Sequence, residues 1–377
     1  MHFTIHLTTR CNFRCGYCYS TPCDNMEMTE ETMRQTVRIA GELDKVNPGI
    51  IFFGGEPLLR KDLIKIGIDE AREISRKTGV PFHFKVTTNG WLMDEEFLEL
   101  CKDNRMTVGL SLDGISTAHD YHRKTAAGEQ THHVLEERAK TLLKYQPYAP
   151  CLMTVTPETL PWYAESVAYL TDLGFRYLNV SLNYAGAWTD DHLVELKKQY
   201  LQLSKWYEKE TLADRKFYFG PFEVKLSTWI QGEDAHCQRC LFAQRQVSVA
   251  PDGAIYPCVQ FVRDGTSLRN YIIGDVWKGL DSDKQNTLFQ QSQEDLEPCL
   301  SCPVKKRCNH RCSCLNFQTT GDINQISPFL CESERLLIPI ADNLGERLYQ
   351  QKSPRFIQKH YNAVYPLLSF LEDQNPS

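Results

Sequence analysis

Residues 11–18 read CNFRCGYC and place three thiols on one short loop. A four-iron, four-sulfur cube takes one thiolate on each iron, so three cysteines leave one iron open to another ligand. The spacing leaves two alternatives: a zinc site with His6 as fourth ligand, or a disulfide with one odd thiol. Of the three interpretations, the spacing favours the open iron–sulfur cluster.

The spacing Cys-x3-Cys-x-aromatic-Cys, directly after an apolar strand, resembles the signature of the radical S-adenosylmethionine (SAM) enzymes. In that family the open iron chelates SAM, and an electron from the cluster cleaves SAM to a 5'-deoxyadenosyl radical that abstracts hydrogen from the substrate. The resemblance implies that Cys11, Cys15 and Cys18 are the cluster ligands. It places Tyr17 near the adenine; packing of that ring onto the barrel is the open alternative.

The length and composition of the chain limit which classes of protein are possible. With 377 residues, the chain is long enough for one full-sized domain and a smaller one. A net charge of −6 gives no general attraction to nucleic acid. The sequence has no apolar run of membrane-spanning length and no signal peptide, which predicts a cytoplasmic protein without a membrane partner. Its fifteen cysteines then indicate metal ligands rather than disulfides.

Residues 1–215 alternate short β runs with longer helical stretches, which predicts an α/β fold with parallel strands. The cysteine loop follows the first strand, at the end where such folds build their sites. The radical SAM resemblance implies a partial (β/α)6 barrel of the TIM type. Strands are predicted at 3–7, 49–53, 82–86, 108–112, 152–155 and 177–182, and helices at 29–43, 63–76, 95–102, 134–145, 162–173 and 192–210.

The alternation is expected to stop near residue 216, where the cysteines become frequent. We predict a radical SAM barrel at 1–215, a bridging segment at 216–236, a cysteine-rich domain at 237–335 and a C-terminal helical segment at 336–377. The cysteine-rich part has few long apolar runs, so metal ligation is expected to supply much of its stability. Within it, Asp252-Gly253 predicts the turn of a hairpin.

Gly54-Gly55-Glu56-Pro57 ends the second predicted strand. Glycines allow a ligand to approach the backbone closely, and a carboxylate can accept hydrogen bonds from an ammonium group. The motif on its own is typical of an ordinary turn. After the second strand it resembles the radical SAM motif for the SAM amino group, with Glu56 at its centre.

The third and fourth strands also end in polar motifs, Thr-Thr-Asn-Gly and Ser-Leu-Asp-Gly. The resemblance implies that Ser111 and Arg123 hold the SAM carboxylate, and arginine suits bidentate binding. A solvated surface arginine is the alternative, and Asn89 also fits an ordinary Asn-Gly turn. The SAM contacts predicted in this way are Tyr17, Gly54, Gly55, Glu56, Pro57, Asn89, Ser111 and Arg123.

The second group of cysteines resembles the SPASM domain, an extension that carries two auxiliary four-iron clusters. It reads Cys-x2-Cys-x5-Cys-x3-Cys, then eighteen residues and a further Cys, with Cys-x12-Gly-x4-Cys upstream. A pair of zinc ribbons is the alternative. The resemblance implies that Cys237, Cys240, Cys258 and Cys312 hold the first auxiliary cluster, and Cys299, Cys302, Cys308 and Cys331 the second. The expected cofactors are thus SAM and three [4Fe-4S] clusters.

Two further points concern the cysteines. If Cys237 is not a ligand, the first auxiliary cluster has an open iron that could bind a substrate thiolate. The remaining cysteines are expected to be small buried apolar residues, although Cys314 lies beside predicted ligands. This last group comprises Cys23, Cys101, Cys151 and Cys314.

The SPASM resemblance implies an enzyme that modifies a ribosomally synthesised precursor peptide by oxidative cross-linking. A thioether from Cys sulfur to carbon is the leading expectation and a carbon–carbon bond is possible; no catalytic residue is assigned. A flavodoxin- or ferredoxin-type electron donor is the second expected partner.

Three alternatives stay open. The first is formylglycine formation, as in anaerobic sulfatase maturases; there an Asp follows the Cys of Tyr-Pro-Cys, and here Val259 does. The second is an enzyme that acts on a small molecule. The third is a non-catalytic iron–sulfur or zinc protein, which would not cleave SAM.

Overall fold

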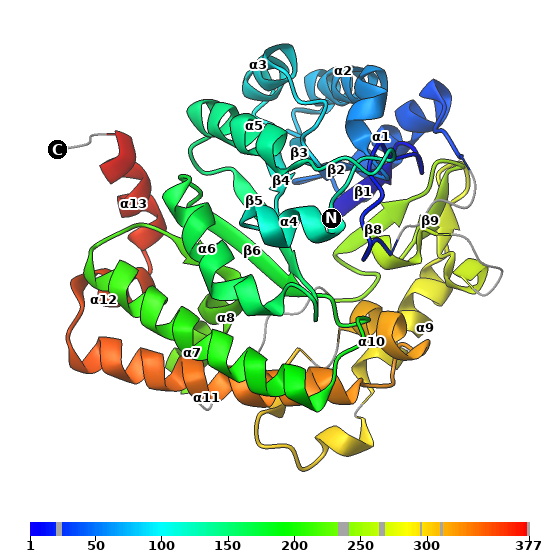
Figure 1. The fold of residues 1–377 in the computed structure, drawn as a ribbon. Helices are drawn as coiled ribbons and strands as arrows, with labels where there is room; N and C mark the ends of the chain where they lie inside the picture. Colours follow the sequence, from blue (N-terminus) through cyan, green and yellow to red (C-terminus); the bar gives the residue numbers. More distant parts are fainter. Residues whose placement is uncertain (20–24, 233–240, 264–267, 295, 310–311, 375–377) are drawn as a thin grey trace.

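The computed structural model describes residues 1–19, 25–232, 241–263, 268–294, 296–309 and 312–374. Its centre is one sheet with the strand order β11-β10-β9-β8-β1-β2-β3-β4-β5-β6-β7. Figure 1 shows these strands surrounded by helices, with α7 and α11 running side by side along one edge of the molecule. The first strands are β1 (His2–His6), β2 (Gly49–Phe53), β3 (His83–Thr88), β4 (Thr107–Ser111), β5 (Pro150–Val155), β6 (Tyr177–Leu182) and β7 (Tyr218–Phe219).

Strands β1 to β7 are parallel, and each pairs with the next strand along the chain. Their carboxyl ends therefore meet at one end of the sheet. This arrangement confirms the predicted α/β fold with a partial barrel. The helices of this part are α1 (Glu30–Leu43), α2 (Lys61–Thr78), α3 (Glu95–Asp103), α4 (Ser116–His122), α5 (His132–Tyr145), α6 (Tyr163–Asp172) and α7 (Asp190–Leu212).

Local sequence explains where several helices begin and end. The Thr29 side chain accepts from the Thr32 backbone N–H and caps α1, and Asp94 caps α3 in the same way. Helix α2 ends at Gly79, whose φ of 75° suits a left-handed cap. The sequence did not indicate α4, because its seven residues (STAHDYH) have no apolar periodicity.

The alternation does not stop at residue 216 as predicted. Strand β7 pairs with β6, and helix α8 (Gly220–Gln231) follows directly, so most of the predicted bridging segment extends the barrel. The reason the sequence missed this unit is physical. A two-residue strand has no measurable alternation, and α8 begins with Gly-Pro, a pair more typical of turns.

The cysteine-rich part continues the same sheet. The hairpin of β8 (Gln246–Val249) and β9 (Ala254–Tyr256) turns at Gly253, whose φ is 93°, and β8 pairs in parallel with β1. Strands β10 (Gly274–Asp275) and β11 (Gly279–Leu280) complete this edge.

The cysteine-rich part also contributes aromatic side chains to the hydrophobic core. The Phe261 ring lies 5.7 Å from Phe242, 4.5 Å from Tyr271 and 4.8 Å from Phe317, measured between centroids. Aromatic residues scattered along the sequence thus meet in space and add packing to this part. The expectation that metal ligation supplies much of its stability stays a prediction. The helices of this part are α9 (Ser282–Gln293) and α10 (Ser313–Thr320).

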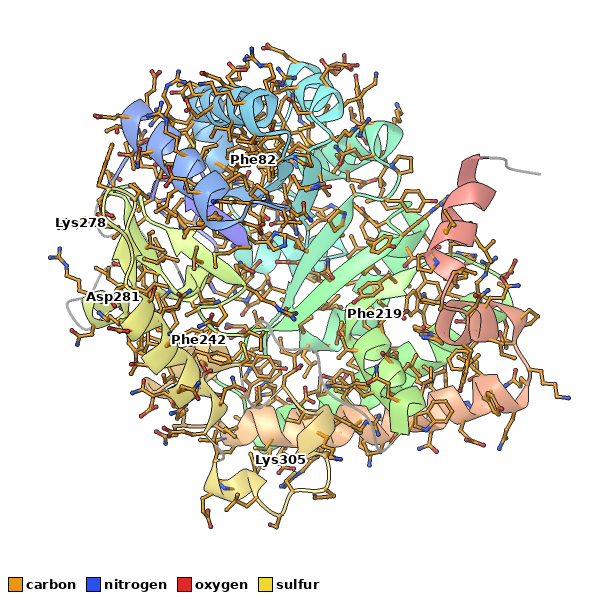
Figure 2. The ribbon with its side chains drawn as sticks, turned by 180° about the vertical axis from the view of Figure 1, so that it is seen from behind. Phe82, Phe219, Phe242, Lys278, Asp281 and Lys305 are labelled. Carbon is orange, nitrogen blue, oxygen red and sulfur yellow. The ribbon has the colours of Figure 1, made fainter. Side chains whose placement is uncertain are left out.

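The C-terminal helices lie along the barrel. Helix α11 (Pro328–Gln350) packs on α7 and α8, and Arg347 binds Glu208 of α7 at 2.9 Å. The predicted division between residues 335 and 336 falls inside α11 and stays a prediction. Helices α12 (Pro354–Tyr361) and α13 (Tyr365–Gln374) follow. Figure 2 shows the layer from behind, with Phe219 among the side chains between β7 and the helices. Among the described helices, none has the length and apolar character needed to cross a membrane.

Candidate active site

A cavity of about 400 Å³ opens at the carboxyl ends of the parallel strands. The cysteine loop forms one wall, strands β2 to β6 supply the next, and the segments after Cys258 and Cys312 close it from the cysteine-rich part. The predicted SAM and cluster residues among its lining are Cys11, Cys15, Tyr17, Cys18, Gly54, Gly55, Glu56, Asn89, Ser111 and Arg123.

Backbone hydrogen bonds fix the cysteine loop to the segment after α4. Arg14 N donates to Lys124 O at 2.9 Å, and Ala126 N donates to Asn12 O at 2.9 Å. Burial raises the pKa of Cys11 to about 12 and that of Cys15 to about 11. Thiolates at these positions therefore need a cation, which an iron cluster supplies. These backbone hydrogen bonds hold the loop with its thiols at the cavity, and none of them gives the Cys11 thiol a positively charged neighbour.

The two glycines of Gly54-Gly55 make room for the start of the cysteine loop. A Cβ on Gly55 would lie 2.2 Å from Arg10 O, and one on Gly54 would lie 2.5 Å from Thr8 O. Gly55 N donates to Thr8 O at 2.8 Å. The glycines were predicted to let a ligand approach the backbone closely. In the structure the backbone of the chain itself, at Thr8 and Arg10, makes this close approach, in addition to any ligand.

Glu56 is a buried carboxylate, with 1% of its surface exposed. It accepts hydrogen bonds from Thr88 Oγ1 at 2.6 Å, Asn89 N at 2.8 Å and Leu58 N at 3.0 Å. Burial raises its pKa to about 7, although these three donors oppose the shift. A buried carboxylate held in this way is suited to receive an ammonium group from the cavity.

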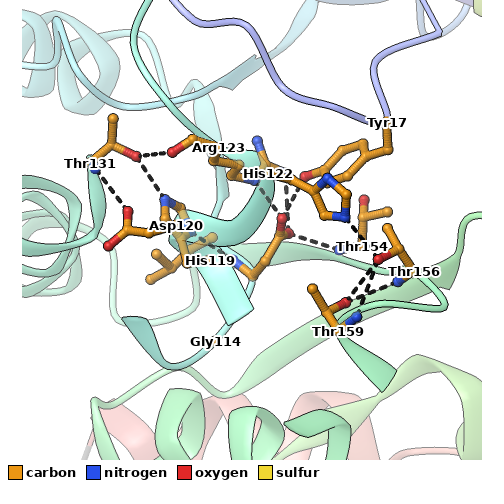
Figure 3. Close-up of polar contacts among 12 residues, drawn as sticks. Tyr17, Gly114, His119, Asp120, His122, Arg123, Thr131, Thr154, Thr156 and Thr159 are labelled. Atoms are coloured by element: carbon orange, nitrogen blue, oxygen red, sulfur yellow. Dashed lines mark hydrogen bonds and ion pairs between the residues drawn. The ribbon is translucent and has the colours of Figure 1, made fainter. Parts of the chain in front are cut away.

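Arg123 is buried against Asp113 rather than solvated. Its Nε lies 2.8 Å from Asp113 Oδ2 and its Nη2 lies 3.2 Å from Oδ1. Tyr17 donates its hydroxyl to the same carboxylate, and its ring centroid lies 5.4 Å from the guanidinium carbon (Figure 3). Burial favours the neutral acid, but the neighbouring guanidinium outweighs it and lowers the pKa of Asp113. Tyr17 thus packs the loop onto the barrel and also lines the cavity, so its predicted place near the adenine stays a prediction.

Helix α4 is tied to this ion pair by neutral groups, as Figure 3 shows. His119 Nδ1 accepts from Asp113 N at 3.2 Å, and its Nε2 lies 3.0 Å from Thr131 Oγ1. Thr131 Oγ1 in turn donates to Arg123 O at 2.7 Å. Burial lowers the pKa of His119 to about 3, so the ring stays neutral while it positions Arg123.

The other predicted SAM contacts are placed as follows. Asn89 Nδ2 donates to Asn12 Oδ1 at 2.9 Å, which ties the end of β3 to the cysteine loop. Ser111 lines the cavity at the end of β4. Pro57 is buried at the start of a short 3₁₀ helix that Glu56 caps, and it is absent from the described lining.

Sequence reasoning missed the substrate-facing part of the lining. Strands β5 and β6 contribute Thr154, Asn179, Ser181 and Asn183, and Gln260 faces them from the cysteine-rich part. The side-chain oxygen of Gln260 is buried and has no hydrogen-bond partner among the described residues. The signal was available for β5 and β6, because polar residues that end a parallel strand belong to the site.

Cys314 lies beside two predicted ligands of the first auxiliary cluster, Cys258 and Cys312. Hydrogen bonds to Cys258 and Cys312 raise the pKa of Cys314, and the bond from Cys314 lowers the pKa of Cys312 to about 7. Cys314 is 5% exposed, so it is buried as predicted but contacts two predicted ligands. Cys101 and Cys151 are buried too. The predicted ligands Cys237 and Cys240, together with Cys23, lie outside the described residues.

Three of the four predicted ligands of the second auxiliary cluster, Cys299, Cys302 and Cys331, lie near the start of α11. Burial and the neighbouring thiols of Cys299 and Cys302 raise the pKa of Cys331. Cys308 is buried in the same part of the chain. Within the described ranges, no group of three His, Cys, Asp or Glu side chains is arranged to hold a metal ion. A cube places each thiolate on a different iron, so its ligands need not converge as those of one zinc ion do.

The residues present fit SAM and a cluster. Three thiols line the cavity, and its described lining holds no fourth cysteine. The same cavity holds the buried Glu56 carboxylate, which could bind the SAM ammonium group, and Ser111 and Arg123, which could bind the SAM carboxylate. Two nitrogens of Arg123 are already bound to Asp113, so a SAM carboxylate would take the rest of its guanidinium.

Comparison with known proteins agrees with this geometry. Residues 5–154 match the Radical SAM superfamily. The chain is 26% identical over 360 residues to the cysteine-type anaerobic sulfatase-maturating enzyme of Clostridium perfringens (strain 13 / Type A), covering 89% of this chain and 96% of that enzyme. It is 25% identical over 350 residues to the PqqA peptide cyclase of Granulibacter bethesdensis, covering 87% and 86%. The solved structure of native anSMEcpe with bound AdoMet and Kp18Cys peptide superposes with a TM-score of 0.79 at 21% identity, covering 92% and 99%.

Fold and site together define an α/β enzyme built on a partial barrel. Residues 5–154 match the Radical SAM superfamily, and the similar proteins that span most of the chain are enzymes. This class implies SAM and one four-iron cluster as cofactors.

Proposed function

We propose that this enzyme oxidises a peptide by radical chemistry and joins two of its residues in a cross-link, with a Cys thioether as the leading product. The support is the similarity along most of the chain to enzymes named for sulfatase maturation and peptide cyclisation. A ribosomally synthesised precursor peptide would be the substrate, and a flavodoxin- or ferredoxin-type protein would supply electrons.

In this proposal each part of the cavity has one role. Cys11, Cys15 and Cys18 hold the first cluster, Glu56 receives the SAM ammonium group, and Arg123 receives its carboxylate. SAM with the reduced cluster would supply the radical that removes one hydrogen atom from the peptide. When the new bond forms, an auxiliary cluster would accept one electron, and the second hydrogen would leave the Cys thiol as a proton to solvent. The walls formed by β5, β6 and the cysteine-rich part exclude water from the reacting residues.

The observation that carries the cross-link is the absence of a substrate-facing acid among the described residues of the lining. Glu56 is the carboxylate there, and its oxygens already accept three hydrogen bonds. Val259, where the sulfatase-maturase resemblance implies an Asp, begins a short 3₁₀ helix, and the neutral Gln260 lines the cavity. A base for aldehyde formation is therefore missing from the expected place.

Formylglycine formation is the second candidate, favoured by the match to the sulfatase-maturating enzyme over 360 residues. Both reactions remove two hydrogens, so the product mass alone does not separate them. A cross-link suppresses fragmentation of the peptide between the joined residues and leaves no aldehyde. A peptide that contains formylglycine fragments fully, and its aldehyde reacts with a hydrazide.

The test uses synthetic peptides encoded by the short reading frames that neighbour the gene. Each is incubated anaerobically with the reconstituted enzyme, SAM and dithionite, and the products are examined by tandem mass spectrometry with and without a hydrazide. A product two hydrogens lighter, with suppressed fragmentation and no hydrazone, is expected. A hydrazone with full fragmentation would assign the reaction to the second candidate.

A further inference from the structure

A second cavity of about 290 Å³ adjoins the candidate active site. The two cavities share Asn179, Ser181 and Leu182 at the end of β6, and Leu315 of α10. Beyond this shared wall the second cavity extends between α8 and α11, away from the cysteine loop. The two cavities are therefore neighbours on either side of the carboxyl end of β6. We name this second cavity the side chamber.

The side chamber is lined by a buried ion pair. Lys225 Nζ lies 2.6 Å from Glu334 Oε2, and these side chains are 2% and 3% exposed. Lys225 Nζ also donates to Arg307 O at 2.9 Å, and Asn309 Nδ2 donates to Glu334 Oε1 at 3.3 Å. An ammonium group has three N–H donors, so these two acceptors leave one N–H of the lysine without a partner among the described residues. A buried pair is costly unless its hydrogen-bonding capacity is used, which points to a ligand.

The rest of the side chamber is aromatic and neutral. Its lining includes four tyrosines, which offer ring faces and hydroxyl groups. Because the ion pair is itself neutral, the described lining of the chamber has no net charge to balance a charged guest, and a third buried charge would lack a partner there. The tyrosines are Tyr163, Tyr184, Tyr200 and Tyr218.

We propose that the side chamber binds an uncharged, hydrogen-bonding residue of the peptide substrate, close in sequence to the residue that reacts. An amide or hydroxyl oxygen of that residue accepts the remaining N–H of Lys225, and its carbon atoms lie against the tyrosine rings. The inference rests on the proposed function, since it assumes that a peptide occupies the first cavity. It adds a selectivity that the radical chemistry alone would not impose.

The test is a selectivity measurement with a library of synthetic peptides that carry one central Cys and randomised neighbours. The library is incubated with the reconstituted enzyme, SAM and dithionite, and the modified peptides are sequenced by mass spectrometry. At one fixed position relative to the reacting residue, Asp, Glu, Lys and Arg should be depleted by about tenfold or more, because burial of an unpaired charge is costly.

Two variants assign that selectivity to the side chamber. Replacing the pair by apolar residues (Lys225→Met with Glu334→Leu) should abolish the preference for hydrogen-bonding residues at that position. Ser181→Asp, which adds a charge at the shared wall where Ser181 is exposed, should instead enrich Lys and Arg there. If the first variant does not fold, the selectivity of Ser181→Asp alone tests the inference.

The matched control removes another ion pair of α8. Glu223 binds Lys359 of α12 outside the side chamber, so Lys359→Met with Glu223→Leu should keep the wild-type preference. Two results would overturn the inference and leave the proposed function standing. In the first, the wild-type enzyme modifies peptides without depleting charged residues at any position. In the second, both side-chamber variants show the same depletion as the wild type. SAM cleavage without modification of any library peptide would contradict both.

Discussion

Asp113 joins three elements around the cavity through one carboxylate. It binds Arg123 after α4, accepts the Tyr17 hydroxyl of the cysteine loop and accepts from Thr154 N of β5 at 2.9 Å. Asp113→Asn should lower the free energy of unfolding of the cluster-free protein by about 3–5 kcal/mol, because it leaves the Arg123 charge buried and unpaired. Chemical denaturation under anaerobic conditions measures this change.

The control for this prediction is an exposed pair of the same type. Arg60 binds Asp62 at 2.7 Å, with side chains 23% and 58% exposed. Asp62→Asn should change the free energy of unfolding by less than about 1 kcal/mol, because water screens the pair. Equal effects of the two substitutions would show that the Asp113 network does not stabilise the site.

Glu56 should make the stability of the cluster-free protein depend on pH. Burial raises its pKa to about 7, so the folded state binds this proton more tightly than the unfolded chain does. This tighter proton binding stabilises the folded state by roughly 3 kcal/mol. The stabilisation is present in full at pH values below the ordinary pKa of a glutamate and is lost as the pH rises towards about 7. Glu56→Gln should remove this part of the slope in denaturation curves taken between pH 4 and pH 8.

The matched control for Glu56 is Glu96, whose side chain is 82% exposed. Glu96→Gln should follow the wild-type curve. If Glu56→Gln also kept the wild-type slope, another group would be responsible for it.

At the scale of elements, the contact between β2 and the cysteine loop should control loading of the first cluster. A Cβ at residue 55 meets the Arg10 carbonyl, a backbone atom that cannot turn aside. Gly55→Ala should therefore displace the loop and lower the iron bound after reconstitution by about four per chain. Iron and sulfide analysis measures this loss.

Gly79 provides the control for Gly55. It caps α2 with a φ of 75°, and an added Cβ there meets nothing within 4 Å. Gly79→Ala should cost about 1 kcal/mol of stability and keep full iron content. Full iron content in Gly55→Ala would contradict the role given to this contact.

Elements with a strong pattern could be predicted, and weak ones could not. Residues 49–53 form β2 as predicted, and Thr29 caps α1 as its sequence indicates. Helix α4 and the β7–α8 unit were missed because seven residues and two residues carry too little periodicity. The partner of β8 could not be predicted either, since its pairing with β1 joins residues more than two hundred positions apart.

The candidate site divides in the same way. The three cysteines of the loop, Glu56, Ser111 and Arg123 share a cavity. All except Arg123 stood in a short motif at a strand end, and Arg123 was predicted from its distance of twelve residues from Ser111. Asp113 was within a quoted motif, but its hold on Arg123 and Tyr17 depends on α4, which the sequence did not indicate. The Lys225–Glu334 pair joins helices that are far apart in sequence, so no local pattern could reveal it.

At the scale of the whole molecule, the account predicts about twelve irons per chain as three cubes. Changing Cys11, Cys15 and Cys18 together to Ala should leave about eight irons and abolish SAM cleavage while the fold persists, because their loop lies above the strands. Iron analysis and circular dichroism measure the two parts. About four irons with stoichiometric zinc in the wild type would contradict the auxiliary clusters.

The central claim is that the radical formed in this cavity takes hydrogen from a peptide. The direct measurement uses a peptide that the enzyme modifies, deuterated at the residue that reacts, and follows deuterium by mass spectrometry. The account predicts that deuterium appears in 5'-deoxyadenosine, in proportion to the cross-linked product. Continued SAM cleavage with modified peptide but no deuterium in 5'-deoxyadenosine from any labelled position would contradict it.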